Sequence, residues 1–282
     1  MPMTRENDLN WRFIDSGLGT AAFNMALDEA LAREAAHSST ATLRVYAWSG
    51  PSVSLGCHQR PGSRLDLQRC RAAGVQVVRR ITGGREVYHD RELTYSFTGP
   101  EGYACLGLGI TESYRVIARG LVQALELLGV EPELSGRRPS RHSGAGGLLA
   151  PCFASTSRYE ITASGKKIVG SAQRRCTRLG SFLQQGSLLL RNSQDRLLEL
   201  SPAGPVSPEG SPSGPGLAAT GLEEVLGRPL EYAEAARAMR QGFEEAFHCR
   251  LEPGQPTARE LDLARDLEQE RYLSLERPER VY

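Results

Sequence analysis

The glycine turn within residues 75–90, VQVVRRITGGREVYHD, constrains the fold more than any other stretch of the chain. An alternating apolar run ends at Arg79 and Arg80, which is typical of a half-buried strand. Gly83 and Gly84 follow, and glycine permits the positive φ angles of tight turns. A second alternating run, ELTYSFTG, comes after the turn. The pattern therefore predicts two antiparallel strands joined at the glycines.

Further strands and helices follow from apolar periodicity. TLRVYAW (42–48), SVSLGC (52–57) and GSFLQQGSLLL predict strands, and Ser164-Gly165 predicts a turn between two more. The segment from Thr20 predicts an amphipathic helix with Asp28 and Glu29 on its polar side. A short helix, DLQRCRAAG, ends in a glycine, and the longest helix covers 110–130.

These elements predict an α+β fold, a mostly antiparallel mixed β-sheet packed with helices. Three divisions are expected: a main domain in 1–200, a mobile loop in 201–216 rich in Pro, Gly and Ser, and a small helical subdomain in 217–282. Within the last division, TGLE at Thr220 and TARE at Thr257 have the pattern of capping boxes, which mark helix starts.

Composition excludes several classes of partner. The net charge is +1 and the pI about 7.6, so global charge favours neither nucleic acid nor a membrane surface. The N-terminal residues lack the apolar core of a signal peptide, which predicts a cytoplasmic protein. None of the six cysteines forms a CxxC or lies at zinc-finger spacing to a histidine, so no metal site is expected and the thiols are expected to be free.

The RRITGGRE stretch is the first that could carry chemistry. Gly83-Gly84 allows close backbone approach to a ligand, and Arg80 and Arg85 are suited to phosphate. A glycine hairpin with solvated arginines explains the same residues. The stretch is not a P-loop, which needs GxxxxGK[ST].

Two lysines and a cysteine are the other candidates. Lys166 and Lys167 are neighbours on a predicted strand, so their side chains are expected on opposite faces and one of them inward. A solvated edge strand is the alternative. Cys152, in APCFASTSRYE, falls where a glycine-rich segment meets a predicted strand, and a thiol on a loop is better placed to react than one in a core.

Three segments in order resemble one family. RRITGGREVYHD is similar to the RRxTGGRAVxHD pattern of the lipoate–protein ligase A and octanoyltransferase group, GKKIVGSAQRR to its K-[IV]-x-GSAQ-R segment, and CFASTSRYEI to its C-F-x-[ST]-x-S-x-[YF]-E segment. The resemblance implies a biotin/lipoate protein ligase-like catalytic domain. The cysteine at 152 resembles the octanoyltransferases that use an acyl-cysteine intermediate.

The resemblance also implies roles and partners. Cys152 would accept octanoyl from an acyl carrier protein thioester, and Lys167 would move protons and help to pass the acyl group to a lysine of a lipoyl domain, such as that of the glycine cleavage H protein. No cofactor is implied, because a thioester drives amide formation without ATP. The residues implied for substrate binding are Arg80, Thr82, Gly83, Gly84, Arg85, His89, Gly170, Ser171 and Ala172.

Two departures leave alternatives open. Glu86 stands where the family usually has alanine, and it could pair with an arginine or alter the acyl pocket. The basic residues in 137–141 could dock an acidic carrier or be a solvated loop. An ATP-dependent lipoate–protein ligase, an octanoyl amidotransferase between lipoyl domains and an inactive lipoyl-domain-binding protein are the other functions that fit.

Overall fold

The computed structural model describes residues 10–38, 40–101, 109–134, 161–202 and 219–275. Cys152, the basic residues in 137–141 and most of the 201–216 segment lie outside the described residues. No helix among the described residues is long and apolar enough to cross a membrane.

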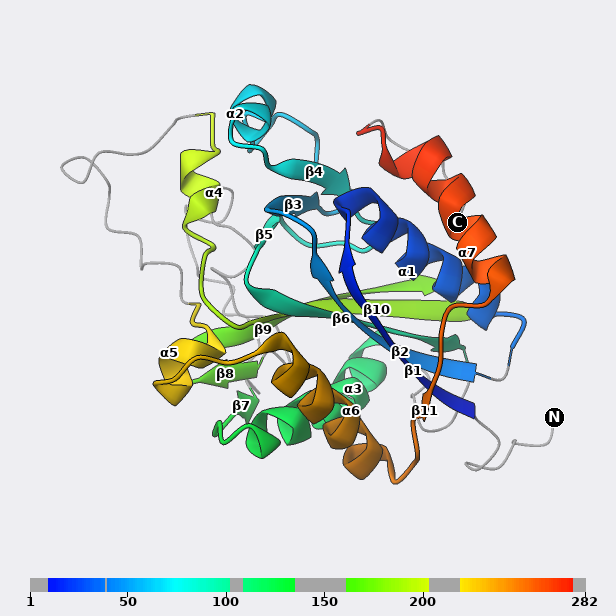
Figure 1. Ribbon diagram of the computed structural model, residues 1–282. Helices are drawn as coiled ribbons and strands as arrows, with labels where there is room; N and C mark the ends of the chain where they lie inside the picture. The colour runs from blue at the N-terminus through cyan, green and yellow to red at the C-terminus, as the bar shows by residue number, and fades with distance from the viewer. Residues whose placement is uncertain (1–9, 39, 102–108, 135–160, 203–218, 276–282) are drawn as a thin grey trace.

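Two sheets organise the chain (Figure 1). The strands of the large sheet are, in spatial order, β11 (Glu252–Pro253), β1 (Asn10–Gly19), β2 (Thr40–Trp48), β6 (Glu92–Pro100), β10 (Ser181–Leu189), β9 (Lys166–Cys176), β8 (Ile161–Ala163) and β7 (Glu133–Leu134). The small sheet has the order β4 (Gln76–Arg79), β3 (Ser52–Leu55) and β5 (Val87–His89). Strands β2, β6, β10, β9, β8 and β7 pair antiparallel in turn, whereas β1 is parallel to both neighbours, which confirms the mostly antiparallel mixed sheet.

The predicted hairpin at Gly83-Gly84 is wrong. Strands β4 and β5 do not pair with each other, because β3 lies between them, parallel to β4 and antiparallel to β5. The ELTYSFTG run is β6 of the large sheet. The glycine turn therefore takes the chain from the strand on one side of β3 to the strand on its other side. Local periodicity does not encode this topology.

Helices lie on both faces of the large sheet (Figure 1). On one face α1 (Ala21–Ala35) packs against the sheet, and α7 (Ala258–Leu267) with η3 (Glu268–Tyr272) packs on α1. On the other face are α3 (Ile110–Leu127) and α6 (Tyr232–Phe247), which pack against each other. Short helices are α2 (Leu67–Ala72), α4 (Arg196–Glu199) and α5 (Leu222–Leu226). The helices after residue 219 thus pack on elements from the first 200 residues, and the three-part division stays a prediction.

Local sequence signals account for most element ends. Gly129 (φ +87°) and Gly74 (φ +65°) follow α3 and α2 in the left-handed region that favours glycine. Ser164 and Gly165 form the predicted turn between β8 and β9. Thr257 makes the predicted capping box with Glu260 at the start of α7.

Two expectations about helices are wrong. The side chain of Thr220 does not cap α5, whose N-cap is Gly221 without a side-chain hydrogen bond. Asp28 and Glu29 are fully buried rather than on a solvated face of α1. The reason is that the sheet and η3 cover α1 from two sides and supply partners, such as the Tyr272 hydroxyl that donates to Glu29.

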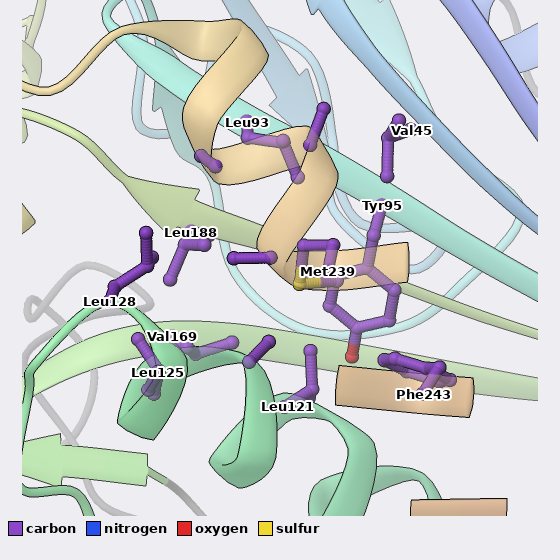
Figure 2. Packing of buried hydrophobic residues seen from close by; sticks show 14 of the residues in the cluster. Val45, Leu93, Tyr95, Leu121, Leu125, Leu128, Val169, Leu188, Met239 and Phe243 are labelled. Carbon is purple, nitrogen blue, oxygen red and sulfur yellow. The ribbon is translucent and has the colours of Figure 1, made fainter. Parts of the chain in front are cut away.

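The two faces of the large sheet differ in chemistry. Leu93, Tyr95 and Phe97 of β6 pack with α3 and α6 in the main apolar core, part of which Figure 2 shows. The alternate residues of the same strand, among them Thr94 and Ser96, are polar and equally buried beneath α1 and the small sheet. A buried polar face needs internal partners, so this face is where a site is expected.

Candidate active site

A pocket opens between the polar face of the large sheet, α1 and the small sheet. About 400 Å³ of space free of atoms lies within it, a volume that includes solvent at its open mouth. The large sheet contributes Tyr46, Trp48, Thr94, Gly170, Ser171, Ala172, Gln185, Gly186 and Ser187. The remaining wall comes from Met25, Ser54, Arg80, Val87 and His89.

Five of the residues expected from the sequence meet at this pocket, namely Arg80, His89, Gly170, Ser171 and Ala172. Arg80 directly follows β4 and His89 ends β5, whereas Gly170, Ser171 and Ala172 belong to β9, far away in the chain. The fold brings these two regions together. Thr82, Gly83, Gly84 and Arg85 are not among the residues that line it.

Arg80 organises the glycine turn from inside. It is only 6% exposed, so the interpretation of a hairpin with solvated arginines is wrong at this position. Its guanidinium donates to the carbonyl oxygens of Gly83 (2.7 Å) and Arg85 (2.8 Å). It also donates to the carbonyl and hydroxyl oxygens of Ser54 at 2.9 and 3.0 Å. Arg80 thereby fixes the turn against β3 while one part of it lines the pocket.

The glycines of the turn and Thr82 support the pocket from behind. A Cβ on Gly56 would lie 2.0 Å from the Gly84 carbonyl oxygen, so the close backbone approach at this turn is to Gly56. Gly84 has φ +94°, a conformation that favours glycine. The Thr82 hydroxyl donates to Oε1 of the pocket residue Gln185 at 3.0 Å.

His89 lies between two polar partners and against a tryptophan. Its Nδ1 lies 2.8 Å from Oε1 of Glu92, and its Nε2 lies 2.7 Å from the Ser54 hydroxyl. Its ring stacks on Trp48 with centroids 3.9 Å apart and planes at 14°. Because carboxylate oxygens only accept, Nδ1 is assigned as the donor, and Ser54 donates to Nε2. These contacts hold the histidine rigidly in the pocket wall.

Glu86 takes the first of its two proposed roles, pairing with an arginine. Its buried carboxylate accepts from Nε of Arg64 at 2.6 Å and from Nε2 of Gln59 at 2.5 Å. Glu86 is not among the pocket-lining residues. Glu86, at the position where the family usually has alanine, therefore links the glycine turn to the segment after β3. It does not contribute to the pocket wall.

The two lysines of β9 divide as expected, since Lys166 is exposed and Lys167 is 2% exposed. A register shift makes Ile168 an extra residue, so Ile168 and Val169 both enter the core under α3 and α6. The alternation then resumes with Lys167 on the face of the sheet that carries Gly170. Ala219, beside Lys167, packs against the pocket residue Val87. Lys167 is therefore linked to the pocket wall through Ala219 and Val87, and it is not itself among the lining residues.

A hydrogen bond across three strands holds Ser171 in place. Tyr95 on β6 is opposite Gly186 on β10, which is opposite Ser171 on β9. The Tyr95 hydroxyl reaches over Gly186 to lie 2.8 Å from the Ser171 hydroxyl, and it accepts from Gln184 at 2.9 Å. A Cβ on Gly186 would lie 2.3 Å from Cε1 of Tyr95, so only glycine permits this crossing. Figure 2 shows the Tyr95 ring extending from β6. Burial raises its pKa to about 12.

The sequence did not single out Met25, Tyr46, Trp48, Ser54, Thr94, Gln185 or Ser187. A usable signal was present in β6, where polar residues alternate with apolar ones in a strand that is buried on both faces. Strand β10 is also buried along its whole length and carries polar residues at its centre. The described residues contain no group of three or more His, Cys, Asp or Glu that could hold a metal ion.

Solved structures share this architecture over most of their length. A crystal structure of lipoate-protein ligase A bound with ATP has a TM-score of 0.74 at 24% identity, covering 94% of this chain and 97% of that protein. The bipartite lipoate protein ligase of Thermoplasma acidophilum has a TM-score of 0.74 at 22% identity, covering 95% and 96%. The fold is that of the lipoate–protein ligases, as the sequence predicted.

Sequence similarity narrows the class. Residues 20–244 match the model of the lipoyl protein ligase A/B catalytic domain. Octanoyltransferase LipM of Kyrpidia tusciae is 41% identical over 91% of this chain and 94% of that protein, and its counterpart in Bacillus subtilis is 35% identical over 94% and 96%. The chain belongs to the lipoyl protein ligase A/B catalytic-domain family.

Proposed function

We propose that the protein is an octanoyltransferase of lipoate biosynthesis that moves an octanoyl group from an acyl carrier protein thioester to a lysine of a lipoyl domain. The observation that carries the proposal is the identity of 35–41% with LipM octanoyltransferases along nearly the full length of both chains. The pocket, with Lys167 joined to its wall through Ala219, supports the proposal.

The proposed nucleophile is Cys152, which lies outside the described residues. Its thiolate attacks the thioester carbonyl, a new thioester forms on the cysteine, and the carrier's thiol leaves. Lys167 protonates the leaving thiolate and later accepts a proton from the incoming lysine amine. The amine attacks the acyl-cysteine, an amide forms, and the cysteine thiolate is released. No nucleotide is consumed.

The pocket is proposed to hold the octanoyl chain. Six buried methylenes at about 0.8 kcal/mol each contribute about 5 kcal/mol to binding. The backbone at Gly170, Ser171 and Ala172, held through Tyr95, is proposed to lie against the reacting end of the chain, with donors for the tetrahedral oxyanion. Docking of a lipoyl domain on the enzyme selects the acceptor. We propose that this acceptor is the glycine cleavage H protein.

The test is octanoyl transfer from a purified octanoyl-carrier thioester to a lipoyl domain in the absence of ATP, followed by mass spectrometry of the acceptor. Transfer without ATP is expected, and Cys152→Ser is expected to abolish it. Modification that requires lipoate and ATP, and that persists in Cys152→Ser, would instead identify a ligase. Transfer that uses only an octanoylated lipoyl domain as the donor, and not the carrier thioester, would identify an amidotransferase. Acceptor binding without any turnover would identify an inactive binder.

A further inference from the structure

The wall of the pocket is chemically unsuited to an alkyl chain at first sight. Trp48, Thr94, Ser187 and His89 all line it and all carry N–H or O–H groups. A donor that faces a hydrocarbon without a partner costs free energy, so the hydrogen atoms of this wall must be directed elsewhere if a fatty tail is to bind.

A single carboxylate behind the wall takes up these hydrogen atoms. Oε1 of Glu92 accepts from the hydroxyls of Thr94 (2.5 Å) and Ser187 (2.9 Å) and from Nδ1 of His89 (2.8 Å). The Trp48 N–H donates to the Thr94 hydroxyl at 2.8 Å and lies 3.2 Å from the same Glu92 oxygen. The Glu92 side chain is 1% exposed and is not among the lining residues. It acts on the pocket entirely through its neighbours.

Asp28 does the same beneath the adjoining part of the wall. Its carboxylate accepts from the hydroxyl of Tyr46 at 2.8 Å and from Nε2 of Gln185 at 2.5 Å, and both residues line the pocket. The buried guanidinium of Arg44 lies 2.6 Å from Asp28 and balances its charge.

We propose that Glu92 and Asp28 determine the specificity of the pocket for a hydrocarbon chain, because they hold the polar hydrogen atoms of its wall away from the ligand. The proposal rests on the proposed octanoyl transfer for its substrate. In this proposal the two buried acids bind the polar hydrogen atoms of the Trp, Tyr, Thr, Ser, His and Gln side chains, so that carbon atoms of these side chains face the ligand. They are positioning residues, since neither lines the pocket itself.

Glu92 offers a matched pair of variants. Its Oε2 has no hydrogen-bond partner within the described residues, so Glu92→Gln can place its amide nitrogen there and keep an acceptor at Oε1. Glu92→Leu has a similar volume and no acceptor, which leaves the hydroxyls of Thr94 and Ser187 free to turn their hydrogen atoms towards the pocket and removes the partner of the His89 Nδ1–H. The two variants therefore separate loss of the charge from loss of the acceptor.

The experiment compares octanoyl and 8-hydroxyoctanoyl carrier thioesters, whose terminal carbons differ by one hydroxyl. For Glu92→Leu we expect the kcat/KM ratio of octanoyl to 8-hydroxyoctanoyl to fall about tenfold or more, the effect of one buried hydrogen bond gained or lost. For Glu92→Gln we expect the ratio to stay within about threefold of the wild type. A folded Glu92→Leu enzyme with an unchanged ratio, or a Glu92→Gln enzyme that shifts as far, overturns the proposal.

Two further measurements keep the result decisive. If Glu92→Leu does not fold, Glu92→Asp withdraws the oxygen by about 1.5 Å and should lower the ratio in the same direction, and no change in that variant overturns the proposal. Calorimetry with free octanoate and 8-hydroxyoctanoate measures the same preference without transfer. A wild-type protein that prefers octanoate but transfers nothing contradicts the proposed function alone, whereas transfer with an unchanged preference in the variants contradicts the role of Glu92 alone.

Discussion

Glu86 provides the clearest test of whether a departure from the family pattern is structural. Glu86→Ala restores the usual family residue and removes the acceptor for Arg64 and Gln59. A hydrogen bond to a charged group contributes about 1.5–3 kcal/mol, and Arg64, 21% exposed in its side chain, regains water when the pair is lost. We expect a loss of about 2–3 kcal/mol in unfolding free energy, or roughly 4–12 °C in Tm for a chain of this size.

The assay is a double-mutant cycle of Glu86→Ala and Arg64→Ala by urea unfolding, with octanoyl transfer measured on each variant. The coupling free energy should be about 1–2 kcal/mol, and transfer should stay within about threefold of the wild type because Glu86 is not in the pocket wall. The exposed pair of Asp262 and Arg265 is the matched control, with expected coupling below about 0.5 kcal/mol. Coupling as weak as the control, or loss of transfer in a folded Glu86→Ala protein, refutes the reasoning.

Three other predictions concern strand packing, a cap and ionisation. Gly186→Ala should lower the free energy of unfolding by about 1–3 kcal/mol and reduce transfer, because its methyl group would lie 2.3 Å from the Tyr95 ring. A neutral effect in a denaturant titration would contradict the passage of Tyr95 over Gly186. Thr257→Ala should cost about 1 kcal/mol in thermal unfolding, and Thr220→Ala, which removes no cap, clearly less. The pKa of Tyr95, raised from 10.0 to about 12, means that the unfolded chain ionises first, so stability should fall as pH rises through this window. Tyr95→Phe should lose less stability over the same window, and an equal loss would exclude Tyr95 as the cause.

Local patterns were sufficient where one residue type determines the backbone. Gly74 and Gly129 ended their helices, and the Ser164-Gly165 turn joined β8 to β9 as an antiparallel pair. Alternation also predicted that one of Lys166 and Lys167 points inward, but not which of them, and it did not predict the bulge at Ile168 that places Lys167 on the pocket face. Such a bulge depends on two consecutive apolar side chains both finding room in the core.

Tertiary partners overrode the local patterns elsewhere. Asp28 has the helical position of a solvated acid, but Arg44 and Tyr46 on β2 pair with it in the interior. Strand β3 separates β4 from β5, so the glycine turn could not be interpreted correctly without knowing which strand lies between. The polar pocket wall could not be predicted for a related reason. The role of Glu92 depends on four donors that only the folded chain brings to its carboxylate.

Intact-mass analysis after incubation with octanoyl-carrier thioester tests the central claim most directly. Without ATP or acceptor, the account predicts one octanoyl group on the protein, located at Cys152 by peptide mapping and absent from Cys152→Ser. Addition of a lipoyl domain should clear the adduct and leave the octanoyl group on the acceptor lysine. A protein that transfers octanoyl while remaining unmodified, or that carries the adduct at another residue, would contradict the account.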